Sequence, residues 1–311
     1  MEVPVHGTPD YRSLGRSLSN WGRWGDDDER GTLNLLTPER RAQAGRLIRT
    51  GHVFDASLPL HEAGPQPTDG QRSNPIHTMT KLPNSDPSPS GFHYFDDALF
   101  LHLQGATQID TLAHVAYDGL LYNGLPIGDI TAEGAQRLGA TNIGVSLTGR
   151  GVLLDIARLR GRPRLSPTEE ITCDDLDAAE EAAGVRVGSG DMLLIRTGWL
   201  SVFTQEADRA TFFASEPGLG LGTARWLKDR DVAFVAADNW GVEVSPTLEG
   251  IDMPLHCVLV RDMGMPLGEM FDLETIAAHA AETGRYEFHL STPAMNIPGA
   301  VGSPATPVVT F

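Results

Sequence analysis

The densest group of residues able to do acid–base or metal chemistry lies between positions 104 and 114, where the chain reads Gln-Gly-Ala-Thr-Gln-Ile-Asp-Thr-Leu-Ala-His. Its titratable members are Asp110 and His114, and its two glutamines add neutral carbonyl oxygens. Aspartate and histidine side chains can exchange protons with a substrate, and both types bind divalent metals. The same pattern also fits a strand end that leads into a helix capped by Asp110. Composition alone leaves both interpretations open.

A second polar group lies later in the chain. Asp252 to His256 precede an apolar run from Cys257 to Arg261, and Glu269 follows a turn that contains two glycines. A single histidine or glutamate beside an apolar run is more often structural than catalytic. Neither group on its own predicts a function.

Short apolar runs rich in β-branched residues predict the strands that would position these groups. Helix signals fall between them: Thr37 and Pro38 form an N-cap followed by proline, and Thr172 to Asp175 has the spacing of a capping box. The alternation of strands and helices indicates a mixed α/β fold with at least eight strands. The predicted strands are 53–60, 98–103, 142–147, 152–156, 192–196, 232–237, 257–261 and 286–290, and the predicted helices are 38–49, 173–184, 223–228 and 272–282.

One long segment, 61–92, is expected to lack regular structure over most of its length. It contains Gly64-Pro65-Gln66-Pro67, Asn74-Pro75 and a run of alternating prolines and serines that ends at Gly91. Irregular segments this long inside a compact domain are usually functional loops or disordered. We therefore predict that this Pro-rich loop lies near the site and could cover it.

Five further motifs lie elsewhere in the chain, apart from the two polar groups. They are Asn20 to Asn34 with two Trp-Gly pairs, Tyr117-Asp118-Gly119, Leu121 to Gly124, Gly190 to Trp199 and Ala237-Asp238-Asn239. Taken in order, the motifs resemble the cyclase family of metal-dependent hydrolases, which includes bacterial kynurenine formamidase and isatin hydrolase. The resemblance covers most of the chain. It implies one α/β domain over residues 1–311. This domain would contain a β-barrel-like mixed sheet surrounded by helices, as in the swivelling fold of kynurenine formamidase.

The family signature reads His-x-Gly-Thr-His-x-Asp-x-x-x-His. Its first two histidines and its aspartate bind metal, its last histidine is catalytic, and a later histidine and glutamate complete the site. Carried over to this chain, the resemblance implies that Asp110 and Glu269 are metal ligands and that His114 is the general acid/base. His256 would be a metal ligand or a second catalytic proton carrier.

The chain departs from this signature at the two early histidines, which are Gln104 and Gln108. An amide oxygen is a harder and weaker ligand than an imidazole nitrogen, so this ligand set should prefer Mn²⁺ or Mg²⁺ to Zn²⁺. On a strand, His102 would share a face with Gln104 and could replace one lost donor. The resemblance also implies that Trp24 lines the substrate pocket, although a core or interface tryptophan fits the sequence equally well. Thr107 is a second predicted substrate contact.

The reaction implied is hydrolysis of a C–N or C–O bond in a small amide, lactam, lactone or related cyclic compound by metal-activated water. Two alternatives stay open. One is a metal-independent cyclase or dehydratase in which Asp110, His114 and Glu269 act as acid–base groups. The other is a catalytically inactive homologue that binds a small molecule.

Composition limits the classes of binding partner that we expect. The 24 basic and 41 acidic residues give a formal net charge of −17, which disfavours nucleic acid and anionic membranes as partners. Two cysteines in 311 residues exclude a disulfide scaffold, and the first residues carry no secretion signal. We therefore expect a cytoplasmic enzyme with a small-molecule substrate, assembled as a homodimer or homotetramer.

Overall fold

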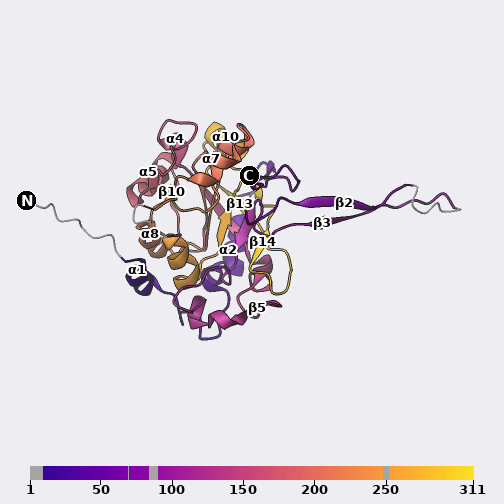
Figure 1. The fold of residues 1–311 in the computed structure, drawn as a ribbon. Helices are drawn as coiled ribbons and strands as arrows, with labels where there is room; N and C mark the ends of the chain where they lie inside the picture. The colour runs from indigo at the N-terminus through magenta and orange to yellow at the C-terminus, as the bar shows by residue number, and fades with distance from the viewer. Residues whose placement is uncertain (1–9, 69, 84–89, 248–251) are drawn as a thin grey trace, which may run out of the picture.

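A nine-stranded mixed sheet forms the centre of the molecule, and helices surround it (Figure 1). The computed structural model describes residues 10–68, 70–83, 90–247 and 252–311. In spatial order the strands are β1 (Val53–Asp55), β15 (Val308–Thr310), β13 (Glu287–Ser291), β7 (Thr148–Asp155), β9 (Met192–Arg196), β11 (Phe234–Ala237), β12 (Leu267–Glu269), β4 (Gln108–Asp110) and β14 (Gly302–Pro304). The middle strands β7, β9, β11 and β12 are parallel, and the strands outside them pair antiparallel. The expected α/β class with a curled, barrel-like sheet is confirmed.

The helices are short. They are α1 (Tyr11–Leu18), α2 (Pro38–Gly45), α3 (Ala140–Ile143), α4 (Ile156–Leu159), α5 (Cys173–Ala183), α6 (Ser201–Thr204), α7 (Arg209–Ala214), α8 (Thr223–Asp229), α9 (Pro254–His256) and α10 (Glu274–Thr283). Five further turns are η1 (Gly31–Leu35), η2 (Tyr122–Gly124), η3 (Ile127–Asp129), η4 (Gly144–Ser146) and η5 (Cys257–Asp262), of which η5 is π-helical and the others are 3₁₀. Three small sheets pair β8 (Glu170–Ile171) with β10 (Gly218–Leu219), β5 (Ile130–Thr131) with β6 (Gly134–Ala135), and β2 (Ile76–Lys81) with β3 (Asp96–Phe100).

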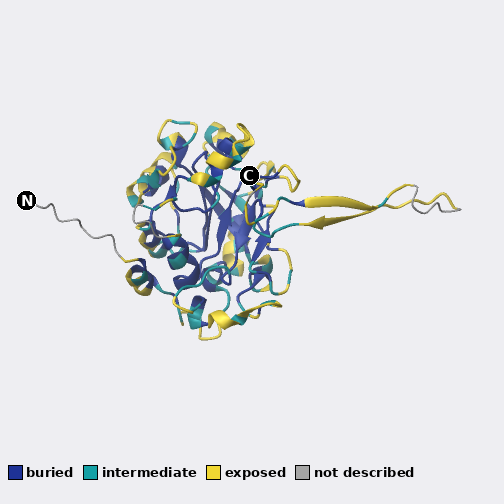
Figure 2. Ribbon diagram, viewed as in Figure 1, coloured by how far each residue is buried: buried dark blue, intermediate teal, exposed yellow. Residues whose placement is uncertain are grey.

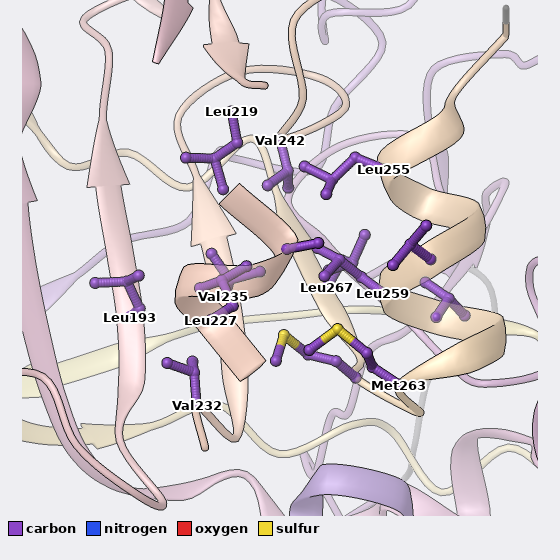
Figure 3. Close-up of a cluster of buried hydrophobic side chains, with 14 of the residues drawn as sticks. Leu193, Leu219, Leu227, Val232, Val235, Val242, Leu255, Leu259, Met263 and Leu267 are labelled. Carbon is purple, nitrogen blue, oxygen red and sulfur yellow. The ribbon is translucent and has the colours of Figure 1, made fainter. Parts of the chain in front are cut away.

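Apolar side chains cover both faces of the central sheet. In β9, Leu193 and Ile195 belong to one buried cluster, whereas Met192 and Leu194 belong to the cluster on the other face. The first cluster includes side chains from α8 and η5 packed over the sheet (Figure 3). Strands buried on both faces are apolar at every position, which explains why the sequence shows continuous runs here.

Both helix caps read from the sequence are confirmed. Thr37 caps α2 by accepting a hydrogen bond from the backbone N–H of Arg40, with Pro38 at the first helical position. Thr172 and Asp175 form the reciprocal capping box of α5, which ends at Gly184 in a left-handed conformation. The predicted helices at 223–228 and 272–282 correspond to α8 and α10.

Two strand predictions are wrong. Residues 142–147 form the end of α3 and the turn η4, and residues 257–261 lie in the π-helical η5. In the first run only Ile143 and Leu147 are buried, and their spacing of four fits a helical turn. The second run is buried at nearly every position and carries no period, so a strand and a buried helix look alike in sequence. Pro254 at the start of α9 marks the helical choice for the second run.

The Pro-rich segment is only partly irregular. It contains one strand, β2, whose partner β3 begins just beyond the segment at Asp96, two residues before the predicted strand 98–103, and ends at Phe100. The two strands form a hairpin that projects from the body and is exposed along its length (Figure 2). Residue 69 and residues 84–89 of the segment lie outside the described part of the chain. We call the described residues 76–83 and 90–100 the arm.

Among the described residues, no helix is both long enough and apolar enough to cross a membrane.

A buried carboxylate joins the ends of β9 and β11. Asp238, at the end of β11, accepts hydrogen bonds from the Thr197 backbone N–H at 2.7 Å, the Thr197 hydroxyl at 2.6 Å and the Gly198 backbone N–H at 2.7 Å. All three donors belong to the turn after β9, and the Asp238 side chain is buried. These three hydrogen bonds hold the carboxyl ends of the two parallel strands together.

Replacing Asp238 by asparagine should destabilise the fold. One carboxylate oxygen becomes an NH₂ group that faces an N–H donor, so we expect Asp238→Asn to lower the free energy of unfolding by about 2–3 kcal/mol. Urea unfolding followed by circular dichroism measures this change. Asp174→Asn, at an exposed position in α5, is the matched control and should stay within about 0.5 kcal/mol of the wild type. Equal stability of the two variants would contradict the assignment.

Candidate active site

Two neighbouring strands bring together three of the predicted site residues. β4 and β12 pair antiparallel, with Gln108 opposite Glu269 and Asp110 opposite Leu267. Side chains directly opposite each other, or two apart on one strand, share a face of the sheet. Gln108, Asp110 and Glu269 therefore point to the same side, and all three are buried. The polar cluster predicted to follow a strand is itself partly a strand.

His256 reaches this cluster from α9. One donor atom each from Asp110, His256 and Glu269 lies within 4.8 Å of the others. The short helix continues directly into η5, and π-helical turns occur often at functional sites. The structure thus brings together the three residues that the resemblance implied as a metal site.

Glu243 orients the imidazole of His256. Its Oε1 lies 2.6 Å from His256 Nδ1 and accepts the His256 backbone N–H at 2.8 Å, while its Oε2 accepts the Leu255 backbone N–H at 3.0 Å. A proton on Nδ1 facing Glu243 leaves Nε2 directed at the cluster, where it lies 3.2 Å from Glu269 Oε1. Such a carboxylate–histidine pair is the usual support of a metal-binding imidazole.

Sequence reasoning missed Glu243. A signal was present, because Glu243 stands between two valines in Gly-Val-Glu-Val, and an acid in an apolar run needs a buried partner. It also missed Glu216, whose side chain is fully buried and accepts the Trp240 backbone N–H at 2.7 Å.

The charges of this region are strongly coupled. Burial opposes a charge on His256, but its hydrogen bonds to Glu243 and Glu269 outweigh burial and hold its pKa well above the usual value. Burial and the charge of Asp110 raise the pKa of Glu269 to about 7, despite the opposing effect of His256. Burial and the charge of Glu269 likewise raise the pKa of Glu216 well above its usual value. The region holds more acidic groups than one imidazolium can balance.

The donor set fits a divalent cation. Asp110 Oδ2 and Gln108 Oε1 are buried and have no hydrogen-bond partner, which is costly unless another group satisfies them. The Gln108 amide nitrogen donates to Glu269 Oε2 and lies 3.5 Å from Asp110 Oδ1. A half-turn of that amide would exchange its nitrogen and oxygen and direct Oε1 at the cluster. Two carboxylates, one imidazole and one amide oxygen are suitable ligands for a hard or borderline metal ion.

Gln104 occupies a different position from Gln108. It lies in the turn after β3, where its amide nitrogen is buried without a hydrogen-bond partner beside Gly302 of β14. His102 lies beyond the end of β3, so the strand face expected to align it with Gln104 does not exist there. His102 Nδ1 instead accepts the Ser73 backbone N–H at 3.0 Å. Metal binding by Gln104 stays a prediction.

A cavity of about 370 Å³ opens onto the cluster. His256 and Glu269 contribute to its wall, and His114 lies beside them with its Nε2 3.7 Å from Asp110 Oδ1. The His114 side chain is 23% exposed, so it can meet both a ligand and solvent. The other lining residues are Arg72, Val115, Trp240, Asp252, Met253 and Cys257.

The two predicted substrate contacts, Thr107 and Trp24, are not among the residues that line this cavity. The Thr107 hydroxyl donates to the Met270 carbonyl at 2.6 Å and accepts the Leu58 backbone N–H at 2.8 Å, so it joins two backbone segments beside β4. Trp24 is half-buried and its ring stacks on the guanidinium of Arg23. Substrate contact by either residue stays a prediction, whereas Trp240 lines the cavity directly.

Comparison with known proteins agrees with this architecture. An isatin hydrolase A from Ralstonia solanacearum is 18% identical over 88% of this chain and 97% of its own, with a TM-score of 0.62. A protein described as a potential metal-dependent hydrolase with cyclase activity is 17% identical over 83% and 98% of the two chains, with a TM-score of 0.55. At these identities the likeness shows the fold alone. No curated protein matches the chain.

Two findings establish the family. The Cyclase family model matches residues 48–244. A crystal structure described as a novel cyclase is 40% identical, covers 96% of this chain and 99% of its own, and has a TM-score of 0.89. The chain therefore belongs to the cyclase family.

Proposed function

We propose that this protein is a metal-dependent hydrolase that opens a C–N or C–O bond in a small amide, lactam, lactone or related cyclic compound. The observation that carries the proposal is the buried group of Asp110, His256 and Glu269, of which His256 and Glu269 line a ligand-sized cavity. The likeness in fold to isatin hydrolase and to proteins described as metal-dependent hydrolases supports the same reaction class.

Asp110, Glu269 and His256 would hold the ion, with Gln108 as a further oxygen donor. An oxygen-rich set with one imidazole favours Mn²⁺ over Zn²⁺. When bound, the ion would polarise the substrate carbonyl and lower the pKa of a water molecule. Glu243 supports this arrangement by keeping the imidazole of His256 in place.

His114 would carry the proton. Its Nε2 lies near Asp110 yet faces the cavity, so it can take a proton at the site and deliver it to the leaving nitrogen or oxygen. Arg72 brings a positive charge to the same cavity, where it would face the developing carboxylate of the product. Burial raises the pKa of Cys257 to about 12, so this cavity residue stays a thiol and is unsuited to act as a nucleophile.

A metal-independent cyclase or dehydratase is the second candidate function. It is favoured by the pKa of Glu269, raised to about 7 by burial and by Asp110, because a carboxyl group of that pKa can both take and give a proton at neutral pH. His114, whose Nε2 lies 3.7 Å from Asp110 Oδ1, would be its proton partner.

Metal binding tests the choice between these functions. We expect the wild type to bind about one Mn²⁺ per chain and to lose hydrolysis of its lactam or lactone substrate on chelation. The double change Asp110→Asn, Glu269→Gln should abolish Mn²⁺ binding, measured by calorimetry and by thermal stabilisation. Glu282→Gln, exposed on α10, is the control and should bind as the wild type does. Full activity of a metal-free protein would instead establish the second candidate.

The role of His114 has a separate test. His114→Ala should lower kcat by roughly 100- to 1,000-fold, since it removes the proton carrier, while Mn²⁺ affinity stays unchanged. A panel of small amides, lactams and lactones, followed by the acid released, identifies the substrate for this measurement. A wild-type protein that binds these compounds without turning any over would establish the catalytically inactive homologue.

Glu243→Gln should weaken Mn²⁺ binding by about 10- to 100-fold, because the His256 imidazole loses the carboxylate that fixes its orientation. Calorimetry at constant pH gives the two dissociation constants. Glu180→Gln is the matched control, since Glu180 is equally buried but pairs with Arg186 and Arg230 away from the site. A similar loss of affinity in both variants would show that general destabilisation, and not orientation of His256, is the cause.

A further inference from the structure

Two arginines, Arg30 and Arg41, converge on one serine at the surface of the molecule. Arg30 lies directly before η1, Arg41 lies in α2, and the serine is Ser146, the last residue of η4. Arg30 Nη2 donates to the Ser146 hydroxyl at 2.9 Å, and Arg41 Nη2 donates to the Ser146 carbonyl at 3.2 Å. Each of these contacts occupies one of the five N–H donors that a guanidinium carries. We call Arg30, Arg41 and Ser146 the arginine cluster.

Within the described ranges, neither arginine of the cluster forms an ion pair with a carboxylate. Burial and the like charge of Arg30 lower the pKa of the Arg41 guanidinium below its usual value. The nearest acids in sequence, Asp28 and Glu29, accept hydrogen bonds from neutral donors instead, which are backbone N–H groups, side-chain amides and a tyrosine hydroxyl. The two positive charges of the cluster therefore lie close together without a negative charge to balance them.

The Nε atoms of both arginines are buried, and neither has a hydrogen-bond partner among the described residues. A buried N–H donor on a charged group is costly when it is left unpaired, and an oxyanion would supply the missing acceptors. The cluster can be reached from solvent, because Arg30, Arg41 and Ser146 are only half-buried. Val145, next to Ser146, exposes 83% of its surface, so η4 lies at the outside of the molecule.

We propose that the arginine cluster binds a phosphate group, either as the free ion or at the end of a small organic phosphate ester. Charge favours phosphate over a carboxylate. Two guanidinium groups carry two positive charges, and a phosphate group at neutral pH carries about −1.5 to −2, whereas a carboxylate balances only one of them. Geometry favours it as well, because phosphate offers at least three acceptor oxygens and each planar guanidinium can bind two of them. The Ser146 hydroxyl adds a further polar group beside them.

The arginine cluster is separate from the candidate active site. Neither Arg30 nor Arg41 lines the cavity beside the metal-binding group. Helix α2 packs against β7 and β13, whereas the metal-binding group lies on β4, β12 and α9, and two strands separate β7 from β12 in the sheet. A phosphate bound at the cluster would join α2, η4 and the start of η1. The inference therefore goes beyond the reaction proposed above and does not depend on it.

Calorimetry of the full chain with inorganic phosphate or phenyl phosphate, at constant ionic strength, tests this site. We expect a dissociation constant of about 1 mM or below for at least one of the two probes. Arg30→Gln and Arg41→Gln should each weaken that binding at least ~10-fold, because each change removes one guanidinium. Arg46→Gln takes a positive charge from the exposed end of α2 and is the matched control, with binding unchanged. Tighter binding of phenyl phosphate identifies an organic ester as the ligand, and equal or weaker binding identifies the free ion; both results support the site.

Arg41→Lys and thermal melting separate phosphate binding from a purely structural role of the arginines. Lysine keeps the charge but loses the planar pair of donors, so Arg41→Lys should bind phosphate more tightly than Arg41→Gln and less tightly than the wild type. Phosphate at about ten times its dissociation constant should raise the melting temperature of the wild type by about 2 °C. The same concentration should raise the melting temperature of Arg41→Gln by less, because the variant binds more weakly.

Four results would overturn the proposal. The first is that neither probe binds the wild type with a dissociation constant below about 1 mM. The second is that Arg30→Gln and Arg41→Gln bind as tightly as the wild type. The third is an equal loss in Arg46→Gln, which would show that only net charge matters. The fourth is a loss in Arg72→Gln without one in Arg41→Gln, which would place the anion in the active-site cavity.

Discussion

Four buried carboxylates surround a single imidazole at the site, and their repulsion in a medium of low dielectric constant is the constraint on which the rest depends. Glu243 contacts one nitrogen of the His256 ring and Glu269 lies near the other. The charge of Asp110 contributes to the raised pKa of Glu269, and the charge of Glu269 contributes to the raised pKa of Glu216. One imidazolium balances only one of these charges. A divalent ion would relieve this excess, and so would protonation of a carboxyl group, which is why hydrolysis and metal-independent acid–base chemistry both arise from the same geometry.

The sheet determines which side chains meet at this site. Antiparallel pairing of β4 with β12 puts Gln108 opposite Glu269, and a register shift of one residue would turn both Gln108 and Asp110 to the other face. The adjacent helix α9 then places His256 over that face. Buried apolar clusters on both sides of the sheet hold this register. The close packing of the core therefore also fixes the positions of the side chains at the site.

Much of the local structure was predictable from the sequence. The caps at Thr37 and Thr172 depend on partners three residues away, and β9 was read at its observed bounds because a strand buried on both faces is a continuous apolar run. Asp110, His256 and Glu269 followed from the resemblance to the cyclase family. Spacing alone could not join the three, because residues so far apart in sequence meet only through strand pairing and helix packing.

The features that the sequence did not predict depend on tertiary structure. The run that starts at Cys257 is a π-helical turn, and because it is buried at nearly every position its sequence shows no period that would indicate a helix. Glu243 supports His256 across 13 residues, a partnership that no local rule predicts. The hairpin within and beyond the Pro-rich segment projects from the body, whereas Arg72 of the same segment lines the cavity. The sequence by itself determined the class of fold, the caps and the types of side chain available to the site, since these depend on near neighbours. The assembled charge cluster and the exposed arm depend on contacts between distant segments, and only the folded chain defines those contacts.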